Sequence, residues 1–149
     1  MNKKENLLVD MQKSIDDLLI TTENLSHEAF ESKIITGTWA TREILCHVAA
    51  WDRVFCEMSK ALLDDEPLPP LPDFDEFNAQ EVKKRETATR DEIVEEVKRN
   101  RALYIRFISR VPLDQLQDSR GQDCTLEGLA RDIISHDTYH LNQIRERLH

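Results

Sequence analysis

Residues 38–74 read TWATREILCHVAAWDRVFCEMSKALLDDEPLPPLPDF. Up to Leu63, apolar side chains recur every three or four residues, which is the period of an α-helix with one buried face; they are Ile44, Leu45, Val48, Trp51, Phe55, Met58 and Leu62. Four prolines at positions 67–72 then exclude a helix, because each lacks an N–H donor and clashes with the preceding turn. The pattern therefore predicts a helix from about Thr38 to Leu63, followed by a long crossover over residues 64–74.

Three other segments show the same helical period. The first runs from about Lys3 to Asn24, another from Thr89 or Arg90 to Val111, and the last from Thr125 to the C-terminus. Residues 26–37 are expected to form a connection, and residues 75–86 a short helix. The chain has only three glycines and five prolines, and so few breakers favour long helices. Together these patterns predict an all-α protein, a four-helix bundle with a long crossover between helices 2 and 3.

The composition is that of one globular domain, residues 1–149. Hydrophobic residues make up 40% of the chain and charged residues 33%, which is an ordinary balance for a folded protein and not for a disordered one. The N-terminal residues lack the apolar core of a signal peptide, and no stretch matches a transmembrane helix. Cys46, Cys56 and Cys124 lack CxxC spacing and fit reduced thiols. We therefore expect a cytoplasmic protein without a membrane partner.

The formal net charge of the chain is −9. Binding of nucleic acids needs a basic surface that meets the phosphates, so the acidic balance predicts no nucleic-acid partner. The same balance argues against docking on anionic membranes. A homodimer is compatible with the sequence, since small bundles often bury leftover apolar surface in a two-fold interface, but no motif indicates one. A small-molecule substrate is the partner that the remaining motifs favour.

Three histidines form a candidate metal site. His136 and His140 are four positions apart in the last predicted helix, so their side chains project from one face, one turn apart. His47 lies within the predicted helix of residues 38–63, on a face otherwise built for the core. Three neutral imidazoles and an open position are a common arrangement around catalytic zinc, and nickel or iron also fits.

Polar and aromatic neighbours suggest further site residues. Glu43 lies one turn before His47, and Asp132 lies one turn before His136. Because metal-bound histidines usually donate their second N–H to a carboxylate or carbonyl, both acids are candidates for that role or for proton transfer. Trp51 and Gln143 share the helix faces of the histidines and are candidate substrate-binding residues.

Each of these residues also has a plainer interpretation. His47 is compatible with a hydrogen-bonded core histidine, and Trp51 with ordinary core packing. Glu43 and Asp132 are compatible with solvated surface acids. Gln143 is compatible with a hydrogen bond across the bundle. The spacing of these residues alone therefore does not decide between a metal site and a purely structural role.

Two segments of the chain resemble one known family. The stretch Gly37-Thr-Trp-Ala-Thr-Arg-Glu-Ile-Leu-Cys-His-Val-Ala-Ala-Trp51 is similar to the second helix of the DinB-like superfamily, and Ser135-His-Asp-Thr-Tyr-His-Leu-Asn-Gln-Ile144 is similar to its last helix. The resemblance implies a four-helix bundle with a crossover, whose metal ligands align with His47, His136 and His140. Ala40 departs from the Ser or Thr that is frequent at its position, which makes Thr38 the expected helix cap.

The resemblance implies several activities. Some relatives are metal-dependent transferases or isomerases that use low-molecular-weight thiols, others resemble self-protection proteins, and some are induced by DNA damage. The leading hypothesis is a metal-dependent enzyme, a hydrolase or a thiol-dependent transferase that acts on small molecules. The alternatives are a protein that binds and sequesters a small molecule without turnover, and a metal that only stabilises the bundle.

Overall fold

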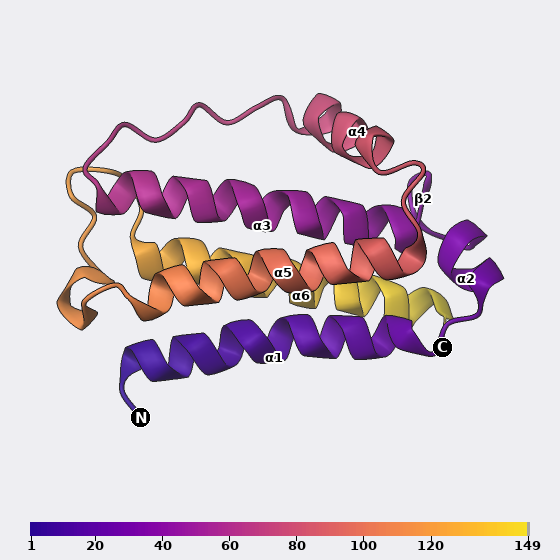
Figure 1. Cartoon of the computed structure of the whole chain (residues 1–149), viewed down its shortest axis with the longest axis horizontal. Helices are drawn as coiled ribbons and strands as arrows, with labels where there is room; N and C mark the ends of the chain where they lie inside the picture. Colours follow the sequence, from indigo (N-terminus) through magenta and orange to yellow (C-terminus); the bar gives the residue numbers. More distant parts are fainter. Residues whose placement is uncertain (149) are drawn as a thin grey trace.

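The computed structural model describes residues 1–148 and is almost entirely helical (Figure 1). The elements are α1 (Lys3–Glu23), α2 (His27–Ser32), β1 (Ile34–Thr36), β2 (Trp39–Ala40), α3 (Thr41–Leu63), α4 (Phe74–Lys84), α5 (Arg90–Ser109), the 3₁₀ turn η1 (Leu113–Gln115) and α6 (Leu126–Leu148). The all-α prediction is confirmed. The last position of the last predicted helix, His149, lies outside the described residues.

Four long helices of 20 to 23 residues, α1, α3, α5 and α6, make up the body of the molecule. Helix α3 packs against α5 and α6, and α1 also packs against α5 and α6. Figure 1 shows that α3 and α5 run in the same direction, while α1 and α6 run in the opposite direction. Because α3 and α5 are parallel neighbours, the connection between them must return along the length of α3. The proline-containing segment and α4 make this return and lie over α3.

Helix starts follow their capping residues. Helix α5 begins with a capping box: the Thr89 hydroxyl accepts from the Glu92 N–H at 3.1 Å, and the Glu92 carboxylate accepts from the Thr89 N–H at 2.9 Å. Helix α3 begins three residues later than predicted, with Ala40 as its N-cap. Alanine offers no side-chain acceptor, so only the carboxylate half of a capping box operates there.

The segment expected as a plain connection contains structure of its own. It holds helix α2 and a small antiparallel hairpin, β1–β2, whose turn includes Gly37 at φ +56°. Because Thr38 belongs to this turn, the prediction that it caps the helix is wrong. The second strand of the hairpin, which contains Trp39, leads directly into α3.

The core consists of two apolar clusters separated by polar residues. Each long helix contributes to both clusters and carries a buried or half-buried polar side chain between them: Ser14, Asp52, Arg101 and Asp137. His47 and His140 are also buried near this level. The middle of the molecule is therefore a polar layer, and the candidate site lies in it.

Within residues 1–148, no helix combines the length and the apolar character needed to cross a bilayer.

Candidate metal centre

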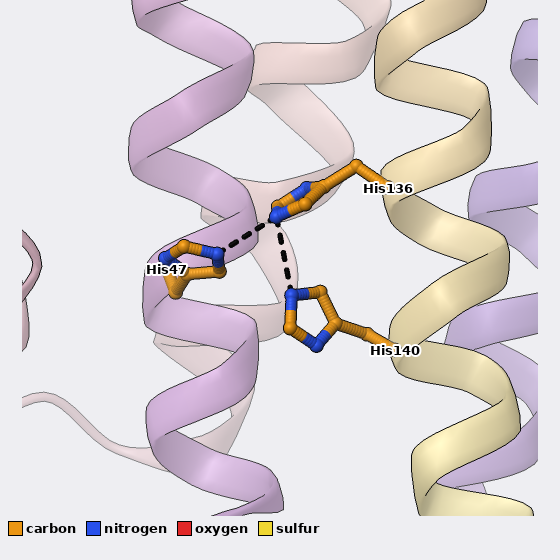
Figure 2. A group of neighbouring side chains, drawn as sticks. All are labelled: His47, His136 and His140. Carbon is orange, nitrogen blue, oxygen red and sulfur yellow. Dashed lines mark hydrogen bonds between the residues drawn. The ribbon is translucent and has the colours of Figure 1, made fainter. Parts of the chain in front are cut away.

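The structure brings His47, His136 and His140 together between α3 and α6 (Figure 2). The Nε2 atoms of His47 and His136 are 2.7 Å apart, and those of His140 and His136 are 3.1 Å apart. One nitrogen from each ring lies within 4.8 Å of the others. In a tetrahedral zinc site, metal–nitrogen bonds of about 2.0–2.1 Å separate the ligand atoms by roughly 3.3 Å. The two measured distances are shorter than this separation, and the three rings lie close enough together to hold one ion.

The hydrogen bond at the far nitrogen of His47 determines its tautomer. Trp51 Nε1 donates to Asn78 Oδ1 at 2.7 Å, and an indole N–H can only donate, so this atom of Asn78 is the carbonyl oxygen. His47 Nδ1 lies 3.1 Å from the same oxygen and therefore carries the hydrogen. In the neutral ring, Nε2 then presents a lone pair to the other histidines.

His140 has the same arrangement. Its Nδ1 lies 2.7 Å from Gln143 Oε1, so its Nε2 also presents a lone pair. His136 Nε2 faces both lone pairs but can hold only one hydrogen, while its buried Nδ1 has no hydrogen-bond partner within residues 1–148. Hydrogen bonds among the rings cannot satisfy all three nitrogens. A cation between them can, which is the observation that fits a divalent metal.

Burial keeps the three rings neutral. Desolvation and the neighbouring His140 lower the pKa of His47 to about 4. Desolvation, together with His140 and His47, lowers the pKa of His136 to about 2. Desolvation also lowers the pKa of His140. Neutral imidazole is the form that binds metals, so the site is ready for an ion at neutral pH.

A pocket of about 480 Å³ opens onto two of the histidines, His47 and His136. Residues of three elements line it: His47, Trp51, Phe55 and Met58 of α3, Leu129, Asp132, Ile133 and His136 of α6, and Leu71, Phe74 and Asn78 of the crossover and α4. The segment that returns from α3 to α5 therefore forms one wall of the pocket. A larger cleft of about 590 Å³ lies between α1 and α5, and none of the three histidines lines it.

The predicted site residues fall into two groups. Asp132 and Trp51 line the pocket, and Gln143 holds His140. Glu43 instead accepts from the Ala40 N–H at 2.8 Å, which caps α3. The amide oxygens of Asn78 and Gln143, and not the two acids, bind the second nitrogens of His47 and His140.

Two residues near the site were missed by sequence reasoning. Asn78 belongs to α4, which the periodicity predicted only as a short helix, and no pattern linked it to His47. The Trp39 ring packs against His47, with centroids 5.1 Å apart. Its position shortly before His47 in the sequence was a signal. The hairpin that orients Trp39 could not be predicted, because its second strand has only two residues.

A buried ion cluster lies next to the histidines. Arg101 of α5 binds Asp52 of α3 through Nε at 3.0 Å and Nη2 at 2.9 Å, and Asp137 of α6 through Nη1 at 2.8 Å and Nη2 at 3.1 Å. Nη1 also donates to the Met11 carbonyl of α1 at 2.8 Å. Ser14 of α1 donates to Asp137 at 2.7 Å. This cluster joins all four long helices and uses every guanidinium hydrogen.

The fold and the site define a helical protein whose three-histidine cluster could hold a metal ion. The family model of the DinB superfamily matches residues 10–144, and the chain belongs to this superfamily. Comparison with curated protein sequences finds no significant match.

Two solved structures share the fold. The colibactin self-resistance protein ClbS, crystallised in complex with double-stranded DNA, aligns with a TM-score of 0.80 and 12% identity over 97% of this chain and 94% of that chain. A structural-genomics protein from Streptococcus pneumoniae aligns with a TM-score of 0.79 and 11% identity over 98% of this chain and 90% of that chain. At these identities the likeness shows the fold alone.

The ClbS complex corrects one expectation. The prediction of no nucleic-acid partner is wrong, because it took the net charge of −9 as sufficient to exclude DNA. A protein with this fold was crystallised on DNA. Net charge sums over the whole surface, whereas phosphates contact a local patch.

Proposed function

We propose that this protein is a metal-dependent enzyme that acts on small molecules, with a divalent ion held by His47, His136 and His140. The observation that carries the proposal is the convergence of three Nε2 atoms, two of them with assigned lone pairs, at a pocket wall. Zinc, nickel and iron all accept such a donor set. The reaction is a hydrolysis or a transfer that uses a low-molecular-weight thiol.

Residues around the proposed ion have separate roles, in orienting the histidines and in proton transfer. When bound, a divalent ion supplies a Lewis acid that lowers the pKa of a ligand in its open position. Asn78 and Gln143 hold the rings of His47 and His140 in the metal-binding tautomer. Asp132 lines the same pocket and is the proposed proton acceptor. The carboxylate of Glu43 is engaged in the helix cap, so we assign it no part in the chemistry.

Elemental analysis tests this proposal. The purified protein is compared with a His136→Ala/His140→Ala variant and with a His27→Ala control, since His27 is exposed on α2. We expect about one divalent ion per chain in the protein and in the control, and loss of the ion in the double variant. Equal metal content in all three, or none after incubation with excess zinc, nickel and iron, would refute the proposal.

Sequestration without turnover is the alternative that uses the same pocket. The apolar walls favour binding of a small molecule whether or not it reacts. Stoichiometry separates the two functions. An enzyme consumes many molecules per chain, whereas a sequestering protein saturates at one.

A second candidate function is contact with DNA. Arg53, Lys60, Arg106 and Arg110 line a cleft between α3 and α5 in which Glu57 is the one acid among the lining residues. This local excess of positive charge, together with the DNA complex of ClbS, favours a phosphate backbone as a partner. An Arg106→Glu/Arg110→Glu variant should lose affinity for duplex DNA, and a Lys3→Glu/Lys33→Glu control should not. Equal binding by both variants would refute this function.

A further inference from the structure

The wall of the metal pocket is built for an apolar ligand. Trp51, Phe55 and Phe74 contribute aromatic rings, with the centroids of Phe55 and Phe74 at 6.2 and 5.5 Å from that of Trp51. Met58 and Leu129 add flexible and aliphatic surface. A pocket of about 480 Å³ with such walls matches the body of an aromatic-sized organic molecule.

The charge of the pocket further restricts which ligands it can bind. Asp132 is an acid, while no lysine or arginine lines the pocket in the part of the chain that the structure describes. The chain as a whole carries a formal charge of −9. A carboxylate on the ligand, away from the donor atom at the histidines, would lie near Asp132 with no lysine or arginine in the pocket lining, and such like-charge contacts are unfavourable.

Polar recognition is concentrated at one end of the pocket. The Oδ1 atom of Asn78 is bound by Trp51 and His47, so this amide has its Nδ2 hydrogens left for a ligand. Beside it, His47 and His136 present the metal position. A ligand therefore meets polar groups at this end and at Asp132, and apolar surface elsewhere.

We propose that the pocket binds an apolar molecule about the size of one substituted aromatic ring, which presents a single donor atom toward the three histidines and carries no anionic group elsewhere. This inference rests on the proposed function, because the donor atom binds the metal. It also narrows that function: a carboxylate-bearing thiol is a poor co-substrate, and a neutral or cationic molecule is a good one.

Two thiols that differ in one group test the inference. The zinc-loaded protein is titrated calorimetrically at low ionic strength with 4-methylbenzyl mercaptan and with 4-(mercaptomethyl)benzoate, which replaces the methyl group by a carboxylate. We expect the neutral thiol to bind at least about tenfold more tightly, which corresponds to about 1.4 kcal/mol. Asp132→Lys should abolish or reverse this preference.

Control variants separate the pocket from general charge effects. Glu57→Lys changes the net charge by the same amount but lies in the cleft between α3 and α5, so it should keep the preference. Phe74→Ser, at a side chain that is 54% exposed and therefore tolerant of change, should weaken both thiols similarly. His136→Ala/His140→Ala should remove the binding of both.

The outcomes distinguish two failures. A protein that takes up neither zinc, nickel nor iron contradicts the proposed function and this inference with it. A zinc-loaded protein that binds the carboxylate thiol as tightly as the neutral thiol, or binds neither at millimolar concentration, overturns only this inference. A preference that Glu57→Lys alters as much as Asp132→Lys also overturns it, because the selectivity would then come from net charge.

Discussion

Two polar clusters lie side by side in the middle of the molecule, and they differ in how completely their groups are paired. His136 and Asp137 are neighbours on α6, yet Asp137 belongs to the Arg101 cluster and His136 to the histidine cluster. In the Arg101 cluster, the guanidinium donates to two carboxylates and a backbone carbonyl, and all three charged side chains are at most 1% exposed. In the histidine cluster, His136 Nδ1 has no partner within residues 1–148, and the lone pairs of His47 and His140 both face the single Nε2 atom of His136.

This difference indicates two different roles. A buried cluster that satisfies its own hydrogen bonds holds helices in register without needing a ligand. A buried cluster whose donor atoms converge without satisfying one another needs a binding partner that is not part of the chain. For three imidazole nitrogens, the partner that fits best is a metal ion. We therefore propose a structural role for the Arg101 cluster and a metal-binding role for the histidine cluster.

Removal of Arg101 should have the largest effect on stability. Arg101→Met leaves Asp52 and Asp137 buried without a cation, so we expect the free energy of unfolding to fall by about 3–5 kcal/mol, measured by urea denaturation. The matched control, Arg101→Met with Asp52→Asn and Asp137→Asn, should recover much of this loss. A single variant within about 1 kcal/mol of the unmodified protein would contradict the structural role.

Acid should destabilise the metal-free protein through the histidine cluster. The folded-state pKa values of His47 and His136, about 4 and about 2, lie below the unfolded value of 6.5. The unfolded chain therefore binds more protons below pH 6.5, and stability falls as the pH falls from 7 to 5, by roughly 2 kcal/mol for each of these histidines.

The Arg101 cluster contributes to this pH dependence with the opposite sign. Burial raises the pKa of Asp52 to about 6, although Arg101 opposes the shift. Protonation of Asp52 in the folded state therefore offsets part of the loss. The readout is the difference between the unmodified protein and a His47→Gln/His136→Gln variant, which should show a weaker loss on acidification. An unchanged pH dependence would contradict neutral, buried histidines.

Loss of the Asn78 amide should weaken the metal site without unfolding it. Asn78→Ala removes the acceptor that fixes the tautomer of His47, and such partners of metal-bound histidines typically contribute about 10- to 100-fold to metal affinity. Zinc affinity is measured by competition with a chelator. Asn142→Ala is the control, because Asn142 is exposed on α6. Equal zinc affinities for the two variants would contradict a role of Asn78 in the metal site.

The smallest expected effect separates the two acids that precede the histidines. Glu43→Ala should lower the free energy of unfolding by about 0.5–1 kcal/mol through loss of the α3 cap and leave zinc affinity unchanged. Asp132→Ala should leave stability unchanged, since Asp132 is exposed at the pocket. A large loss of zinc affinity in Glu43→Ala would contradict the assignment of Glu43 to the cap.

The two clusters also differ in how far they could be predicted from the sequence. The long helices follow from a local apolar period, and the meeting of His136 with His140 follows from a spacing of four. The Arg101 cluster does not follow, because Asp52 and Asp137 lie 49 and 36 positions away from Arg101 and only packing brings them together.

Asn78 was unpredictable for the same reason. It reaches His47 from 31 positions away, because the crossover folds back over α3. The spacing of Glu43 and Asp132 suggested carboxylate partners for the histidines. The Glu43 carboxylate instead accepts the Ala40 N–H at the start of α3 and therefore serves as a helix cap. Partners supplied by another element are visible only in the fold.

X-ray absorption spectroscopy of the zinc-loaded protein tests the central claim most directly. We predict three imidazole nitrogens and one further light donor at about 2.0–2.1 Å from the ion, and loss of this signature in His136→Ala/His140→Ala. A sulfur neighbour at about 2.3 Å, or a shell of oxygens without imidazole, would contradict a metal held by His47, His136 and His140.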